Sequence, residues 1–309
     1  MFVFYTTPIA FNTNTSFQTQ FQSQLTGGTL GGDGFTFVLQ NSPAKVSAKG
    51  SSGGNLGYGG TVTPITKSLA IKFNTSKNAI DPNKNNIAVL QDGSSIGLLG
   101  YWKFDEATGK TVLDSSGNNN KGSLINSSRT VGLYGQALQV SRKNSSYASI
   151  PASASLNSMS NQITVSAWAR PNGKPVGFEA VVNRQIRTLV HPDQFFLGFG
   201  TRNRVTTYKW ELGTTNGEGD VYKGLPTADR WVHLVGTYDG SMLRLYVDGV
   251  QIGANPVTGN LLVDNNPVTI GAAENYAEGT PLGDRFDGLV DEVRIYNRAL
   301  SATEIMNLR

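Results

Sequence analysis

Residues 230–249, RWVHLVGTYDGSMLRLYVDG, predict two strands joined by a tight turn. Asp239-Gly240 is the strongest hairpin signal in the chain, because a type I′ turn needs positive φ at both of its central residues. Leucine and valine occupy every second position after this turn, the period of a strand with one buried face. A second pair, Asp248-Gly249, turns the chain back again, so we expect a β-meander.

The composition extends this prediction to the whole chain of 309 residues. Glycine is abundant, with 36 residues, and only 16% of the residues are charged. Turn-forming residues separate short apolar runs, a pattern typical of an all-β fold with an antiparallel β-sandwich or jelly roll. Ser301 and Glu304 form a capping box that predicts one short C-terminal helix over residues 302–308. Further strands are expected at 35–40, 69–75, 87–90, 164–170, 195–200 and 268–271.

Charge and cysteine content exclude several classes of function. The net charge of +4 is scattered, without a basic stripe interleaved with aromatic residues, so we expect no nucleic-acid partner. The absence of cysteine excludes disulfides and thiolate metal sites. The longest apolar run, residues 96–102, is too short to span a membrane. The first fifteen residues lack the charged and apolar regions of a secretory signal.

Residues 96–309 resemble the laminin-G-like jelly rolls of the concanavalin A-like lectin and glucanase class. The resemblance rests on several blocks in order: GLLGYWKFDEATGK, YGQALQV, ITVSAWARP, WVHLVGTYDG and FDGLVDEVRIYNRALSATEI. It covers nearly all of this segment, which we treat as one domain. The resemblance implies a two-sheet sandwich and, by analogy of fold alone, carbohydrate binding.

Residues 1–95 resemble the first half of a bacterial L-type (legume-like) lectin domain. The blocks GGDGFTFVLQNSP, GGNLGYGG and SLAIKFNT carry this resemblance. It implies that the side chain of Asp33 binds sugar hydroxyls and that the loop containing Gly54 and Asn55 offers backbone N–H groups to the sugar. The alternative is that Asp33 is only a turn residue in Asp-Gly.

Two departures from the lectin pattern predict that this first segment has lost its metal chemistry. The family has Glu and Asp where this chain has Lys72 and Asn74, and hard cations prefer anionic oxygen ligands. The second half of the lectin domain is also missing. We therefore expect 1–95 to be a partial lectin-like β segment that packs on the second domain or pairs with a protein partner or another copy of the chain.

Two carboxylates in the second domain are candidate ligands of a structural calcium ion. Strict alternation from Leu289 to Ile295 places Asp291 on the apolar face of the last strand, where a carboxylate needs a partner. We expect Asp105, at the end of the first strand, to lie nearby, and two carboxylates with loop carbonyls suit Ca²⁺. The alternative is a buried Asp291 satisfied by backbone N–H groups and hydroxyls.

Aromatic side chains are the other candidates for sugar binding. Tyr276 lies in a predicted loop and is the favoured sugar platform, whereas Tyr208 and Trp210 fall on a face that we expect to be core. His233 is expected to pack or orient neighbouring groups. The remaining tryptophans, Trp102, Trp168 and Trp231, are also expected in the core.

The sequence predicts a protein that is not an enzyme. Glycoside hydrolysis needs two carboxyl groups across one cleft, and no E-x-D-x-E triplet or other acidic pair is evident. Two functions remain open: a carbohydrate-binding or adhesion protein, and a structural or assembly protein that uses its sandwiches for protein contacts. Either function fits an extracellular, cell-surface or virion-surface location.

Overall fold

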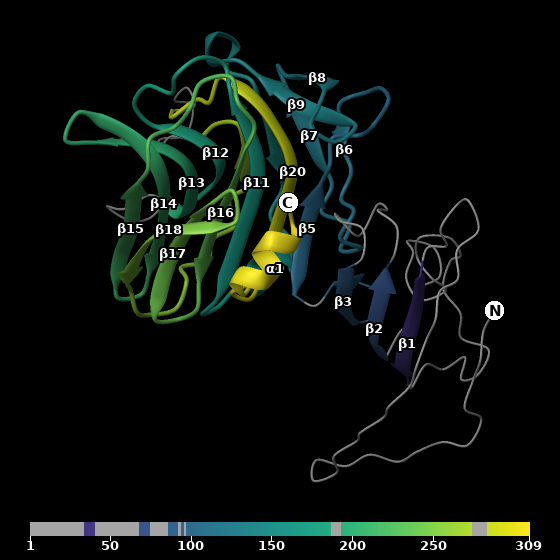
Figure 1. Cartoon of the computed structure of the whole chain (residues 1–309). Coiled ribbons are helices and arrows are strands. Elements are labelled where there is room, and N and C mark those ends of the chain that lie inside the picture. The colour runs from purple at the N-terminus through teal and green to yellow at the C-terminus, as the bar shows by residue number, and fades with distance from the viewer. Residues whose placement is uncertain are drawn as a thin grey trace, which may run out of the picture. The chain divides into compact units, whose positions relative to one another are not determined.

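The computed structural model describes residues 34–40, 68–74, 86–91, 94–95, 97–186, 193–273 and 283–309. The chain divides into two compact units, Met1–Ile96 and Gly97–Arg309. Each unit is built from antiparallel β-structure, as predicted from the sequence (Figure 1). None of the helices among the described residues is long and apolar enough to cross a lipid bilayer.

The first unit contains an antiparallel sheet in the order β1-β2-β3-β4. In the backbone register, Phe37 of β1 lies opposite Ile71 of β2, and Ile71 lies opposite Val89 of β3. The strands expected at 35–40, 69–75 and 87–90 are confirmed within one or two residues. The strands are β1 (Gly34–Gln40), β2 (Ser68–Asn74), β3 (Asn86–Gln91) and β4 (Ser94–Ser95).

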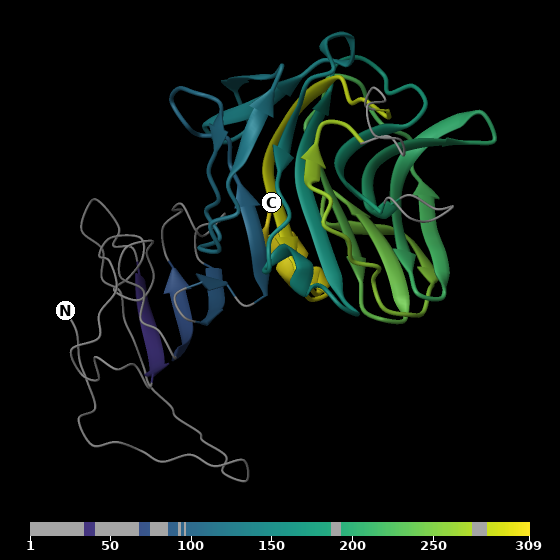
Figure 2. The ribbon, with the colours of Figure 1, turned by 180° about the vertical axis from the view of Figure 1, so that it is seen from behind.

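The second unit is a sandwich of two antiparallel sheets that face each other across one core (Figures 1 and 2). We call them the front sheet and the back sheet. The front sheet contains, in order, β15 (Gly217–Lys223), β14 (Val205–Thr214), β13 (Asp193–Arg202), β12 (Glu179–Gln185), β19 (Val268–Ile270), β10 (Tyr147–Ile150), β7 (Gly122–Ile125) and β6 (Thr111–Val112). The back sheet contains, in order, β18 (Val250–Pro256), β17 (Met242–Val247), β16 (Val232–Tyr238), β11 (Ile163–Pro171), β20 (Gly288–Tyr296), β9 (Gln136–Val140) and β8 (Ser128–Val131), and β5 (Leu98–Trp102) pairs with β20.

Large aromatic side chains fill the space between the sheets. Trp102, Tyr208 and Trp210 belong to the main hydrophobic core, as predicted. Gly236 of β16 leaves the room that Trp210 occupies, because a Cβ added there would lie 2.1 Å from the indole. Trp231 is only half-buried and precedes β16, so the expectation that it lies in the core is wrong.

The β-meander predicted from residues 230–249 is present, but its type I′ turn is the second one. Asp248 and Gly249 both have positive φ, at 50° and 78°, and directly join Val247 to Val250. In the first turn only Gly240 has positive φ. There the carboxylate of Asp239 accepts hydrogen bonds from the two backbone N–H groups that follow Gly240, so side-chain bonding shapes this turn.

A β-bulge in β20 overturns the face assignment made from strict alternation. Glu292 has φ of 54°, and the pairing with β11 shifts register at this point. The extra residue reverses the phase of the strand, so Val290 joins the core while Leu289 and Asp291 lie on the outer face of the back sheet. Strict alternation placed Val293 and Ile295 correctly in the core and misplaced the residues before the bulge, because it has no signal for an inserted residue.

The C-terminal helix α1 (Ala302–Asn307) has the predicted capping box. Ser301 accepts a hydrogen bond from the backbone N–H of Glu304, whose side chain accepts one from the backbone of Ser301. Ile305 and Leu308 pack into a second hydrophobic cluster with Val235, on the outer face of the back sheet, as predicted from the sequence.

Candidate functional site

Four of the predicted sugar-binding residues lie outside the described residues. They are Asp33, Gly54 and Asn55 of the lectin-like segment and Tyr276 of the second domain. Their roles stay predictions from the sequence. Tyr208 and Trp210, the less favoured aromatic candidates, are core residues and offer no ring face to a ligand.

Asp105 and Asp291 both contact the turn between β8 and β9. Asp291 Oδ2 accepts hydrogen bonds from the backbone N–H groups of Leu133 and Tyr134, each at 3.0 Å. Asp105 Oδ1 accepts one from the backbone N–H of Gln136 at 2.9 Å. The two predicted metal ligands are therefore brought to one turn, where each holds backbone donors.

Backbone donors satisfy Oδ2 of Asp291, whereas its buried Oδ1 has no hydrogen-bond partner among the described residues. Calcium takes six to eight oxygen ligands, and within the described ranges no group of three acidic, histidine or cysteine side chains is placed to hold a metal. The pKa of Asp291 is raised to about 7, mainly by burial and also by the nearby charge of Glu292, while hydrogen bonds from backbone N–H groups act in the opposite direction. Calcium at this position stays a prediction.

Trp168 and His233 lie beside Asp291 in one row across β20, β11 and β16. The two rings stack with centroids 5.0 Å apart, and the ring of Tyr134 meets Trp168 edge-on. His233 Nε2 pairs with the hydroxyl of Ser166 at 2.9 Å, and burial, with smaller contributions from nearby arginines, lowers the pKa of this histidine to about 3. A buried neutral histidine fits the predicted packing or orienting role.

A buried ion pair continues this cluster toward α1. Arg294 and Glu292 meet at 2.5 Å, and the hydroxyl of Tyr101 donates to Glu292 at 2.7 Å. The side chains of the pair are only 3% and 7% exposed. We call Tyr101, Tyr134, Trp168, His233, Asp291, Glu292 and Arg294 the signature cluster, because each comes from one of the sequence blocks that carry the laminin-G-like resemblance.

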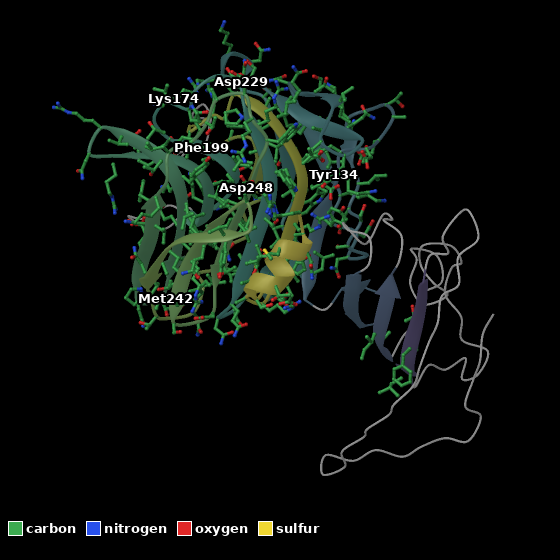
Figure 3. All side chains as sticks on the ribbon, in the orientation of Figure 1. Tyr134, Lys174, Phe199, Asp229, Met242 and Asp248 are labelled. Atoms are coloured by element: carbon green, nitrogen blue, oxygen red, sulfur yellow. The ribbon has the colours of Figure 1, made fainter. Side chains whose placement is uncertain are left out.

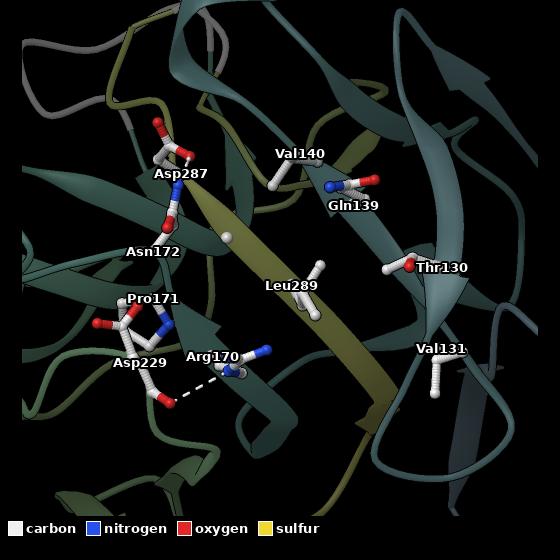
Figure 4. Close-up of a pocket in the computed structure, with 11 residues that line it drawn as sticks. Thr130, Val131, Gln139, Val140, Arg170, Pro171, Asn172, Asp229, Asp287 and Leu289 are labelled. Carbon is white, nitrogen blue, oxygen red and sulfur yellow. Dashed lines mark hydrogen bonds between the residues drawn. The ribbon is translucent and has the colours of Figure 1, made fainter.

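A groove of about 310 Å³ lies beside the signature cluster on the outer face of the back sheet (Figure 4). Its floor is the row Arg170, Leu289 and Gln139, which lie opposite one another on β11, β20 and β9. Thr130 and Val131 of the edge strand β8 form one side. The bulge in β20 is what turns Leu289 away from the core and into this floor.

Loop residues complete the groove at the other side. Asn172, Asp229 and Asp287 line it, and Asn172 Nδ2 donates to Asp287 Oδ1 at 3.4 Å. Arg170 Nε donates to the backbone carbonyl of Asp229 at 3.1 Å, which holds the loop against the floor (Figure 4). Within the described part of the chain Arg170 makes no ion pair, so its Nη groups remain donors to a ligand.

The groove thus combines both kinds of hydrogen-bonding group over an apolar strip. A guanidinium and two amides donate, two carboxylates accept, and Leu289, Val131 and Pro171 supply apolar surface. Sequence analysis did not nominate this site, because its floor depends on the register of three strands and on the bulge. The one available signal was the pair of polar residues around the end of β11, Arg170 and Asn172.

A second polar cluster lies on the outer face of the front sheet. The Lys209 ammonium pairs with Glu211 at 2.9 Å and lies over the rings of Phe178 and Phe196. Burial raises the pKa of the neighbouring Asp193 to about 7. These groups bond mainly to one another and leave less free hydrogen-bonding capacity than the groove.

Comparison with solved structures shows the class of fold. The chain is similar to domain 4 of AbnA, an extracellular arabinanase from Geobacillus stearothermophilus solved with arabinotriose, with a TM-score of 0.52, 20% identity, and coverage of 68% of this chain and 97% of that one. It is also similar to the binding domain of Paraclostridial Mosquitocidal Protein 1, with a TM-score of 0.51, 20% identity, and coverage of 68% of this chain and 51% of that one. The second unit therefore has a lectin-like β-sandwich fold.

Family models identify both parts of the chain. The model of the concanavalin A-like lectin/glucanases superfamily matches residues 142–306, more than half of the chain, and the chain belongs to that superfamily. The legume lectin domain model matches residues 2–95. A curated relative, Adhesion G-protein coupled receptor V1 of Danio rerio, is 27% identical over 154 residues, which are 47% of this chain and 2% of the relative. The chain thus spans only a small part of that relative's length.

Proposed function

We propose that this protein binds carbohydrate without changing it chemically, and that the groove of the back sheet binds an uncharged glycan. The observation that supports this proposal is the mixture of groups that line the groove. Arg170 and Asn172 are hydrogen-bond donors, and they lie beside the acceptors Asp229 and Asp287. Sugar hydroxyls both donate and accept, so a neutral sugar satisfies both sets at once. An acidic sugar would face two carboxylates with one guanidinium to offset them.

The shape and surroundings of the groove support this proposal. The side chains of Leu289 and Val131 offer apolar surface that suits the C–H face of a sugar ring. The floor of the groove belongs to three hydrogen-bonded strands, so the backbone holds the donor residues Arg170 and Gln139 in fixed positions. Membership of a lectin and glucanase superfamily, and a similar fold solved with arabinotriose, point the same way by analogy. An extracellular location belongs to the same proposal.

A glycan array probed with the full chain, with and without EDTA, is the first test. We expect binding of at least one neutral oligosaccharide, insensitive to EDTA because no metal enters the groove's chemistry. Titration with that oligosaccharide should then show a loss of affinity of about two- to tenfold for Gln139→Ala, the effect of one hydrogen bond. The matched control is Gln251→Ala, an exposed amide on β18 at the far edge of the same sheet.

Three results would refute the proposal: no glycan bound, equal losses for the test and control variants, or a ligand cleaved during the titration. Cleavage would move the assignment to the glucanase side of the superfamily.

An assembly function remains the second candidate, supported by one observation in the first unit. Leu39 and Ile71 lie on the same face of the four-stranded sheet and are 37% and 39% exposed, which gives this sheet apolar surface for a protein contact. Sedimentation velocity of the full chain tests it, and a stable oligomer together with an empty glycan array would favour this function.

A further inference from the structure

We propose that one end of the front sheet docks on the surface of a lipid bilayer that contains acidic lipids. At this end of the sheet β12 and β14 begin, and β13 and β15 end. These four strands are neighbours and antiparallel, so three loops of the chain meet there. This inference rests on residues other than those that line the groove, although the loop before β12 also carries Asn172 and the loop after β15 also carries Asp229.

Each of the three loops combines a cation with an exposed apolar side chain. The loop before β12 carries Lys174 and Val176, and Val176 is 69% exposed. The β13–β14 turn carries Arg204 beside Val205, which is 47% exposed. The loop after β15 carries Lys223 and then Leu225, which is 68% exposed. We call these six residues the cationic rim.

Contacts across the sheet tie the loops together. A Cβ added at Gly200 of β13 would lie 2.8 Å from the ring of Tyr222 and 3.3 Å from that of Phe178, so both rings flank this strand end. Arg202 lies over the Tyr222 ring at 4.3 Å. Figure 3 shows Lys174 at the same end of the domain as Asp229, with Met242 at the opposite end.

The charges of the rim are unbalanced. Arg202 is paired with Asp220 at 2.7 Å. Among the described residues, Lys174, Arg204 and Lys223 have no acidic partner, and all three are exposed. Basic residues close to a bilayer are attracted to acidic head groups. The rim is therefore complementary to an anionic surface.

The apolar side chains distinguish a membrane from a soluble polyanion. A polyanion needs only the cations, whereas a bilayer also accepts apolar side chains into its interfacial region. Four of the large apolar residues that are exposed in the second unit, namely Val176, Phe178, Val205 and Leu225, lie at this end of the front sheet. Their pairing with cations in every loop is the pattern that a membrane surface fits.

Co-sedimentation of the full chain with vesicles tests the inference. The probes are phosphatidylcholine vesicles with and without phosphatidylserine, and dextran sulfate serves as a soluble polyanion. We expect binding only to the vesicles that contain phosphatidylserine. Lys174→Gln with Arg204→Asn should weaken partitioning roughly thirtyfold, from two lost basic residues. Val176→Ser with Leu225→Ser should weaken it at least about tenfold, from lost apolar insertion.

The control is Val250→Ser, which alters a 63% exposed apolar residue on β18 of the back sheet and should leave binding unchanged. Because all five altered side chains are exposed, we expect the variants to unfold like the wild type when followed by tryptophan fluorescence. No binding to the acidic vesicles would overturn the proposal. Wild-type partitioning by the serine variant, with tight binding to dextran sulfate, would also overturn it and leave a polyanion site. If Val250→Ser weakened partitioning to the vesicles as much as the rim variants do, the proposal would also be overturned, because the cationic rim would have no special role.

Discussion

Removing Arg294 should strongly destabilise the second unit. Its guanidinium pairs with Glu292 at 2.5 Å and bonds the hydroxyl of Tyr101 at 2.7 Å, and the two charged side chains are 3% and 7% exposed. Arg294→Met keeps a long apolar stem but leaves the carboxylate of Glu292 buried without a cation. Breaking a buried pair in this way costs about 3–5 kcal/mol of the free energy of unfolding.

Urea denaturation of the full chain measures this loss. All four tryptophans, at positions 102, 168, 210 and 231, lie in the second unit, so tryptophan fluorescence reports its unfolding selectively. The matched variant is Glu292→Gln with Arg294→Met, which removes the stranded charge and should recover part of the loss. The control is Arg230→Met, which breaks the exposed pair between Arg230 and Asp248 at 2.7 Å. This change should lower the free energy of unfolding by about 1 kcal/mol or less, because an exposed pair contributes little.

Two results would refute this account of Arg294. One is a loss below about 1 kcal/mol for Arg294→Met, the range of an exposed pair. The other is a double variant less stable than the single one, since that would show that the carboxylate is stabilising without its cation.

Three further predictions concern packing, pH and metal. Gly236→Ala should lower the free energy of unfolding of the second unit by about 1–3 kcal/mol in the same urea assay, because the added Cβ would lie 2.1 Å from the indole of Trp210. Asp193, whose pKa is raised to about 7, stabilises the fold while protonated, so wild-type stability should fall relative to Asp193→Asn as pH rises from about 4 to above 7. A relative rise would contradict this. EDTA should leave the melting temperature unchanged if Asp105 and Asp291 only hold backbone N–H groups, and a fall would establish the predicted calcium site.

The fold could be predicted because its signals are local. The Asp-Gly pairs, the apolar alternation and the capping box each act within a few residues, and they gave the meander, the core position of Trp210 and the helix after Ser301. The errors came from side-chain bonding and from the bulge. The Asp239 carboxylate shapes the first turn, and one inserted residue at Glu292 reverses the faces of the part of β20 that precedes it.

The candidate site could not be predicted because it is a property of the assembled sheet. Its floor joins Gln139, Arg170 and Leu289, which meet only through the pairing of three strands. Nothing in their sequence spacing indicates that they are neighbours. Asp105 and Asp291 each accept backbone hydrogen bonds at the turn between β8 and β9, a turn that the sequence did not assign to this role, and their role as metal ligands stays a prediction.

The floor of the groove, formed by Gln139, Arg170 and Leu289, comes from the same sequence blocks as the signature cluster and lies on the same face of the back sheet. The signature cluster is buried, ion-paired and stacked, so its residues are constrained by stability. The groove begins two residues away along the strands, at Arg170 after Trp168 and at Leu289 before Asp291. The bulge connects the signature cluster with the groove. The inserted residue, Glu292, is itself buried in the cluster, and its insertion turns Leu289 outward into the groove. The blocks that carry the resemblance therefore supply the strands of both features, whereas the groove's sides include residues outside the quoted blocks, namely Thr130, Val131, Asn172 and Asp229.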